Sequence, residues 1–161
     1  MDNQTFGTSL TINKMNDTNM NEKIDIGPYN RGELCPYCHG TTKKISGGEI
    51  FGHGKGFDHI LMFKCSGTCD AYCGSKFYQG QRVSIGSLAN KELRELRKKC
   101  HLLFDAQWKG KRNEKLSKKK AYVWLQKFMN LPDELAHFGM FNIEQCNKVI
   151  EELSNKTNNE V

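Results

Sequence analysis

Four of the seven cysteines lie in two short, closely spaced pairs, which is the pattern of a metal site. Cys35-Pro-Tyr-Cys38 forms the first pair, and Cys65-Ser-Gly-Thr-Cys69 follows after an interval of 26 residues. Zn²⁺ in structural sites takes four thiolate or imidazole ligands arranged as a tetrahedron, and two facing Cys loops supply that geometry. The spacing therefore predicts one structural Zn²⁺ held by Cys35, Cys38, Cys65 and Cys69.

The second pair leaves the identity of one ligand open. Its spacer is one residue longer than the usual two, and Gly67 could accommodate the extra residue because glycine accepts backbone angles that other residues avoid. Cys73 follows Cys69 by four residues and could replace either member of the second pair. Cys100 and Cys146 fall on apolar stripes of expected helices, so we interpret them as buried core residues.

Disulfides and redox chemistry are the alternative roles for the paired cysteines. The N-terminus shows neither the basic and apolar segments nor the cleavage site of a secretory signal, which favours a reducing cytoplasm, bacterial or of a host cell, and hence metal over disulfides. A thioredoxin-type pair at Cys35 and Cys38 requires a βαβ unit, whereas Gly-rich sequence follows it. No apolar run approaches the roughly 18 residues of a membrane span, so we expect no membrane partner.

Positive charge is concentrated in one part of the chain. Residues 89 to 120 hold 12 of the 24 Lys and Arg against four acids, a local net charge of +8, while the remainder sums to −2. Such a concentration indicates a polyanionic partner, DNA or RNA. A solvated basic face on a module that docks another protein is the alternative. The candidate nucleic-acid contacts are Arg94, Arg97, Lys98, Lys99, Lys109, Lys111, Arg112, Lys118, Lys119 and Lys120.

The residues before the basic region predict a tail and a small β module. Residues 1 to 28 are rich in Asn and Thr and lack apolar periodicity, which predicts a disordered tail. Residues 29 to 86 contain both Cys pairs and short β-type runs, such as 41 to 45 and 59 to 64, separated by glycines. So small a module cannot bury enough apolar surface alone, so metal binding must contribute to its folding free energy.

Residues 87 to 153 change to helical periodicity. The first helix follows an N-cap at Asn90 and carries Arg94 and Arg97 on its polar side. Ser117 is the expected N-cap of the second helix, and a third opens with a capping box at Asn142 and Gln145. Their apolar stripes are Leu93, Leu96, Cys100 and Leu103; Ala121, Trp124, Leu125 and Phe128; and Cys146, Val149, Ile150 and Leu153.

These elements predict an α+β fold. A small zinc-ribbon-like β-hairpin module precedes a basic module of three helices, into whose core Trp108 packs. The second helix ends before Pro132, and residues 154 to 161 form a frayed tail. No pattern indicates a small-molecule substrate.

Several ordered motifs resemble those of a family of zinc-finger-containing domains in uncharacterised phage and bacterial proteins. The resemblance covers about residues 33 to 151 and implies a zinc-binding fold and nucleic-acid association, without an established activity. The family has a two-residue spacer in its second Cys pair and an aliphatic residue at the position of Cys73. The motifs are Cys35-Pro-Tyr-Cys38, Cys69-Asp-Ala-Tyr72, Leu88-Ala-Asn90, Leu93-Arg94, Arg97, His101, Phe104-Asp105, Trp108, Ala121-Tyr-Val-Trp-Leu125, His137-Phe-Gly-Met-Phe141 and Cys146.

One motif bears on catalysis. Phe57-Asp58-His59-Ile60 superficially resembles the Asp-His-Ile of zinc-supported HNH nucleases, in which the His activates water beside a second metal ion. No Asn lies between His59 and Cys65, and no His follows Cys69 before His101, so the second ligand set is missing. We therefore expect a non-enzymatic, zinc-binding accessory protein that binds nucleic acid. A zinc-stabilised protein-interaction module is the alternative, and a nuclease is the least favoured hypothesis.

Overall fold

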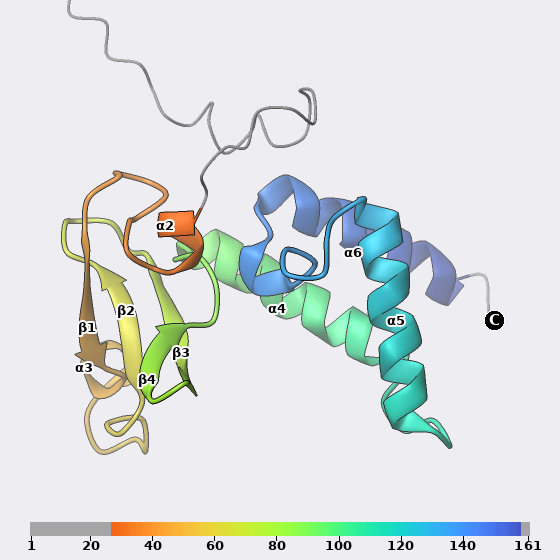
Figure 1. The fold of residues 1–161 in the computed structure, drawn as a ribbon, viewed down its shortest axis with the longest axis horizontal. Helices are drawn as coiled ribbons and strands as arrows, with labels where there is room; N and C mark the ends of the chain where they lie inside the picture. Colours follow the sequence, from red (N-terminus) through yellow and green to blue (C-terminus); the bar gives the residue numbers. More distant parts are fainter. Residues whose placement is uncertain (1–26, 159–161) are drawn as a thin grey trace, which may run out of the picture. The chain divides into compact units, whose positions relative to one another are not determined.

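The computed structural model describes residues 27–158, and the chain divides into two compact units between Leu88 and Ala89 (Figure 1). The sequence placed this boundary two residues earlier. All but the last two residues of the predicted tail, 1 to 28, lie outside the described residues, as do residues 159–161. One unit is built on a sheet and the other on helices, which confirms the predicted α+β class.

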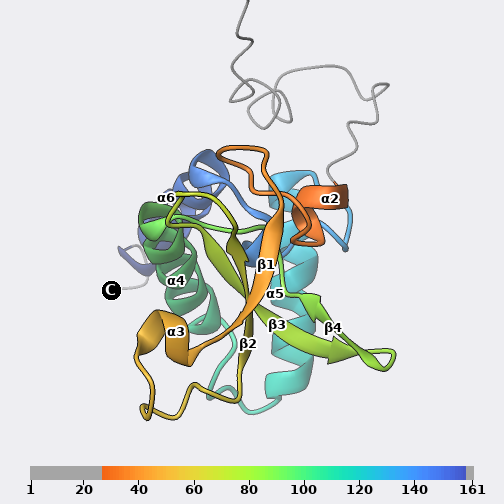
Figure 2. The ribbon, with the colours of Figure 1, turned by 90° about the vertical axis from the view of Figure 1, so that its left-hand side faces the viewer.

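The first unit, the zinc unit, contains one antiparallel sheet of four strands in the order β1-β2-β3-β4 (Figure 2). Two single-turn helices accompany the sheet, one before β1 and one between β1 and β2. The elements are α2 (Gly27–Asn30), β1 (Thr42–Ser46), α3 (Gly48–Phe51), β2 (Leu61–Cys65), β3 (Tyr72–Tyr78) and β4 (Gln81–Ser84).

The larger buried cluster of the zinc unit lies on one face of this sheet, while Ile45 and Met62 are buried on the other face. Phe63 of β2 pairs in register with Cys73 of β3, so the two side chains share a face, and both are buried. Ala71 and Leu88 join them, together with two of the paired cysteines. Phe63 and Leu88 are the large apolar side chains of this cluster, and even with Ile45 and Met62 on the other face the unit buries few of them for its length.

The second unit, the helical unit, contains the three predicted helices and a short 3₁₀ turn: α4 (Lys91–Asp105), α5 (Glu114–Met129), η1 (Phe138–Met140) and α6 (Ile143–Asn158). Asn90 caps α4, since its side chain accepts the N–H of Leu93 at 3.0 Å. Asn142 and Gln145 exchange side-chain to backbone hydrogen bonds of 2.8 and 2.9 Å, which confirms the capping box before α6.

Two predicted helix ends are wrong. The helix α5 begins at Glu114 because Asn113, an equally good N-cap, accepts the N–H of Leu116 at 3.2 Å; Ser117 lies inside the first turns. The helix α6 continues to Asn158, five residues past its predicted end. Lys156, in that extra turn, pairs with Glu152 at 3.2 Å and covers the ring of Trp124.

The helical unit has a larger apolar core than the zinc unit. Phe104 of α4, Leu125 of α5 and Val149 of α6 are fully buried and belong to one cluster with Phe138 and Phe141 of the connecting segment. Cys100 and Cys146 are buried in the same cluster, as the helical periodicity predicted, and Trp108 is buried there as well. Within residues 27–158, no helix combines the length and the apolar character needed to cross a bilayer.

Candidate metal centre and basic surface

The first Cys pair lies on a tight turn whose backbone closes on itself. The N–H of Cys35 donates to the carbonyl of Gly40 at 2.9 Å, and the N–H of His39 donates to the carbonyl of Cys35 at 2.8 Å. His39 has a φ of 58°, a left-handed conformation at the point where the chain reverses. A bridge between Leu34 and Thr41 then leads into β1, so the sheet fixes the position of the turn.

The second Cys pair lies where β2 leaves the sheet. Cys65 is the last residue of β2, and its N–H donates to the carbonyl of Ala71 across the loop at 2.9 Å. Cys69 lies within this loop, before β3 begins at Tyr72. Because β1 and β2 are paired, the loop and the first turn meet at the same end of the sheet: the N–H of Ser66 donates to the carbonyl of Thr41 at 3.1 Å.

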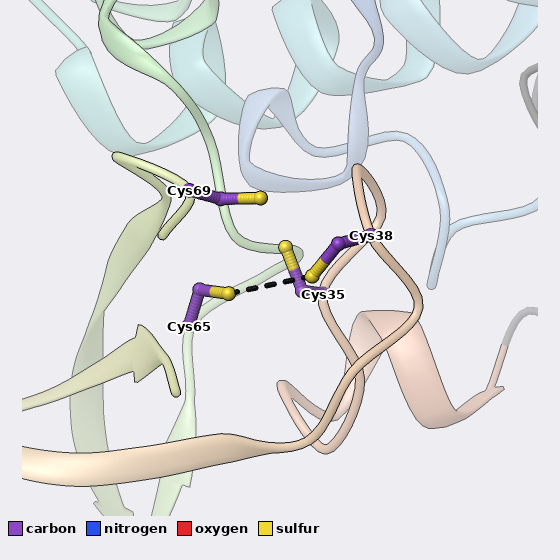
Figure 3. A group of neighbouring side chains, drawn as sticks. All are labelled: Cys35, Cys38, Cys65 and Cys69. Atoms are coloured by element: carbon purple, nitrogen blue, oxygen red, sulfur yellow. Dashed lines mark hydrogen bonds between the residues drawn. The ribbon is translucent and has the colours of Figure 1, made fainter. Parts of the chain in front are cut away.

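The four sulfurs converge. The Sγ atoms of Cys35, Cys38, Cys65 and Cys69 all lie within 4.8 Å of one another, and those of Cys38 and Cys65 are 3.5 Å apart (Figure 3). A tetrahedral Zn²⁺ with Zn–S bonds of about 2.3 Å would separate its sulfurs by about 3.8 Å. The donor set is all sulfur, which suits Zn²⁺ and not the hard cations Ca²⁺ and Mg²⁺. The residues therefore fit the metal.

The turns also prepare the thiols for a cation. The backbone N–H of Gly40, with help from Cys65 and Cys69, lowers the pKa of Cys38 to about 7. The N–H of Gly67 points at the Sγ of Cys65 at 3.3 Å and so helps to hold this sulfur in place. Burial raises the pKa of Cys35 to about 12, so this thiol needs the charge of a bound cation to ionise at neutral pH.

The structure separates the two candidates for the fourth ligand. Cys69 belongs to the converging group, whereas Cys73 lies within β3, faces the core, and its Sγ donates to the carbonyl of Gly86 at 3.3 Å. The geometry therefore selects Cys69. Gly67 does not have a positive φ, and its N–H points at the Sγ of Cys65.

The nuclease-like motif lies in the connection between β1 and β2. The carboxylate of Asp58 contacts Nδ1 of His53 at 2.5 Å and accepts the N–H of Gly54 at 2.8 Å, so it closes this glycine-rich loop. Within the described residues, the four cysteines are the one group of three or more His, Cys, Asp or Glu side chains placed to hold a metal. The absence of enzymatic activity stays a prediction.

Eight of the ten predicted nucleic-acid contacts are exposed side chains of the helical unit. They lie on α4, on the loop after it and on the first half of α5. Lys109 pairs with Asp105 at 2.5 Å, so its charge is partly neutralised. The eight are Lys98, Lys99, Lys109, Lys111, Arg112, Lys118, Lys119 and Lys120.

The two arginines of α4 are not placed as expected. Arg97 is buried, and its Nε and one Nη both donate to the carbonyl of Phe141, at 3.0 and 2.9 Å. Its predicted position on the exposed polar side is therefore wrong, because a guanidinium can satisfy a buried carbonyl that the helices leave unpaired. Arg94 is half-buried and donates to the carbonyl of Ala89 at 2.7 Å.

A small pocket of about 260 Å³ lies within the basic surface. Two predicted contacts, Lys111 and Lys120, line it, together with Trp124 and Lys156. Sequence reasoning missed both of the latter. Trp124 follows Lys120 by one helical turn, so a helical projection of α5 would have shown that the two side chains are neighbours. Lys156 lies in the segment that the sequence predicted to be frayed.

Comparison with known proteins adds one finding. The model of a family described as a zinc-finger-containing domain matches residues 31–156, a range that includes all four converging cysteines and most of both units. No curated protein and no solved structure matched the chain.

Proposed function

We propose, from the premise that this chain belongs to the family of zinc-finger-containing domains, that it is a zinc-binding accessory protein that associates with nucleic acid through its helical unit. The observation that carries the proposal is the exposure of eight cationic side chains over α4, α5 and the loop between them. The zinc unit supplies the metal centre, and its ion serves stability without taking part in a reaction.

A single structural Zn²⁺ accounts for how the zinc unit folds. Its main cluster holds six buried residues, of which three are cysteines and two, Phe63 and Leu88, are large apolar side chains; Ile45 and Met62 are buried on the other face of the sheet. Full burial of these four large side chains contributes about 6–12 kcal/mol. A structural zinc site binds with about 10–16 kcal/mol at neutral pH, all of which favours the folded state when the unfolded chain has no preformed site. Zinc binding thus contributes at least as much as the burial of the large apolar side chains.

The basic surface suits a phosphate backbone. Three lysines, Lys111, Lys120 and Lys156, line the pocket, and Glu152 pairs with only one of them. Phosphate contacts by lysines are sequence-independent and supply most of the affinity in non-specific binding. We therefore propose weak binding to DNA or RNA at low salt, with little preference for sequence.

Salt dependence of binding tests this proposal. Affinity of the zinc-loaded protein for a labelled 20-base-pair DNA duplex would be measured by anisotropy from about 50 to 200 mM salt, where each phosphate contact contributes about 0.9 to the log–log slope. Changing Lys111 and Lys120 together to Ala should make the slope shallower by about 2. Lys127→Ala, at the far end of the same helix, is the control and should change it by less than half a unit.

Binding that is absent at about 50 mM salt, for duplex and for single strands of DNA and RNA, would overturn the proposal, because the electrostatic attraction is strongest there. That outcome favours the alternative, a module that docks another protein through a solvated basic face.

A further inference from the structure

One face of the sheet in the zinc unit carries a row of polar and aromatic side chains that the metal site does not use. Lys43 of β1 pairs in register with Lys64 of β2, and Lys64 pairs with Tyr72 of β3. Residues directly opposite each other in antiparallel strands project from the same face. The three side chains therefore form one row across the sheet, on the face opposite Phe63 and Cys73.

The charge of this sheet has one sign. The four strands contain five charged residues, and all five are cations: Lys43, Lys44, Lys64, Lys76 and Arg82. Lys43 and Lys64 stand directly opposite each other, an arrangement that is unfavourable in the free protein because like charges repel. An anion bound between the two ammonium groups would remove that repulsion.

Exposed aromatic rings continue the row. Phe51 of α3 meets Tyr72 edge to face, with ring centroids 5.9 Å apart, and Phe57 lies 4.9 Å from Phe51. Phe51 is 37% exposed and Phe57 40% exposed, which is unusual for phenylalanine in a unit so short of core. The two rings thus present apolar surface to solvent at the end of the row formed by Tyr72, which pairs with Lys64.

The same face continues along β3. Because side chains alternate along a strand, Tyr72, Lys76 and Tyr78 project from one face. The Nζ of Lys76 lies 5.9 Å from the ring centroid of Tyr78, whose side chain is exposed. Tyr72, Lys76 and Tyr78 thus place two rings and one cation on this face over about 20 Å, the length of six residues of extended chain, with Gly74 between Tyr72 and Lys76.

We propose that this face, defined by Lys43, Lys64, Tyr72, Phe51 and Phe57, binds single-stranded nucleic acid. The lysine pair would contact the backbone phosphates, and an unpaired base would stack on the exposed phenylalanine rings. A duplex hides the faces of its bases in its own stack, so the aromatic part of the site selects single strands. The inference rests on the proposed function for the class of partner, but it concerns a different unit and a different form of the polymer.

Matched variants of the zinc-loaded full chain test the site. Phe57→Leu keeps an apolar side chain but removes the ring, and Phe77→Leu does the same at an exposed ring of the opposite face, beside Arg82. Lys43→Ala has an equally close control in Lys44→Ala, since Lys44 lies on the face of Phe63 and covers its ring at 5.3 Å. Zinc content and circular dichroism of each variant should match the parent.

The probes are a 15-nucleotide dT oligomer, the corresponding U oligomer, and the DNA duplex. Stacking of one base contributes enough that its loss weakens binding roughly 5- to 150-fold. Phe57→Leu should therefore weaken single-strand binding at least fivefold, whereas Phe57→Trp, which keeps an aromatic ring, should bind the single strand as the parent does. Lys43→Ala should weaken it as well, and both control variants should change it less than twofold. Duplex affinity should stay within twofold for all of these variants. The two oligomers distinguish DNA from RNA as the preferred strand.

The outcomes separate the two proposals. Equal effects of Phe57→Leu and Phe77→Leu, or an equal loss of duplex binding, overturn the single-strand site while leaving the basic surface of the helical unit intact. Single-strand binding that depends on Phe57 but not on Lys111 and Lys120 supports this site, and duplex binding that does not depend on Lys111 and Lys120 overturns the helical one. Binding to none of the three probes overturns both.

Discussion

The two units are stabilised in different ways, although each buries cysteines. Cys35 and Cys65 of the zinc unit are as fully buried as Cys100 and Cys146 of the helical unit. Burial alone therefore does not distinguish a metal ligand from a core thiol. The backbone does: the first two lie at turns whose N–H groups face sulfur, whereas the other two project from helices, where the backbone N–H groups are already paired.

The difference in core size follows the same division. The helical unit buries Phe104, Leu125, Phe138, Phe141 and other apolar side chains in one cluster. The zinc unit buries fewer large apolar side chains, so under the proposed function its folding depends on the metal. Loss of zinc and loss of apolar packing should consequently act on different units.

The largest expected effect is that of the metal. Removing zinc with a chelator, or changing Cys35 to Ser, should unfold the zinc unit, because the lost binding free energy of about 10–16 kcal/mol exceeds or equals the usual stability of a whole domain. Amide NMR spectra should lose the signals of the β-sheet and keep those of the helical unit. Elemental analysis should find about one zinc per chain before treatment.

A reduced, purified protein without stoichiometric metal would contradict the expectation that the zinc unit depends on a bound metal. So would a chelator that melts the helical unit together with the sheet. Cys69→Ser should lose zinc as Cys35→Ser does, because its sulfur belongs to the converging group.

The reciprocal change is Phe104→Ala. Phe104 is fully buried in the helical unit and meets Phe138 and Tyr122 edge to face. Its truncation should cost about 3–5 kcal/mol of unfolding free energy, from lost transfer energy and a cavity. Denaturant unfolding followed by tryptophan fluorescence reports on this unit, since both Trp108 and Trp124 lie in it. Zinc content should be unchanged; a loss of zinc would show that the two units do not fold separately.

These contrasts show what the sequence could predict. Helices α4 and α6 and their caps followed from local signals, namely an apolar stripe and a capping residue a few positions away. The strands β3 and β4 were not identified individually, because Gly74 and Ser75 interrupt the β-type pattern of β3 and pairing with β2 and β4 decides it. Asn113 and Ser117 both satisfy the local rule for an N-cap, so sequence alone could not choose between them.

The candidate site divides in the same manner. Three of the converging cysteines could be predicted from spacing, but Cys69 and Cys73 are both compatible with it. Only the path of β3, which turns Cys73 toward the core, separates them. The predicted position of Arg97 was wrong because its guanidinium donates to the carbonyl of Phe141, 44 residues later in the chain. No local sequence pattern indicates a contact at that distance along the chain.

Arg97 provides the next test within the helical unit. Changing Arg97 to Ala should cost about 1.5–3 kcal/mol, because hydrogen bonds from a charged donor are lost and the carbonyl of Phe141 is left buried without them. Lys98→Ala, the neighbouring exposed position, should change stability by less than about 0.5 kcal/mol. Thermal unfolding of the two variants compares them directly. Equal small effects would place Arg97 back among the surface cations.

The smallest effect should come from the cysteines outside the converging group. Substituting one such cysteine in each unit compares the two units at the same residue type. Cys73→Ala in the zinc unit and Cys146→Ala in the helical unit each remove a buried thiol that acts as a small hydrophobe. Each should cost about 1 kcal/mol, the centre of the range for single substitutions, measured by urea unfolding. Zinc stoichiometry should stay at its parental value in both. If Cys73→Ala released the metal while Cys69→Ser retained it, the ligand set would be Cys35, Cys38, Cys65 and Cys73, and the loop holding Cys69 would have to rearrange on binding zinc.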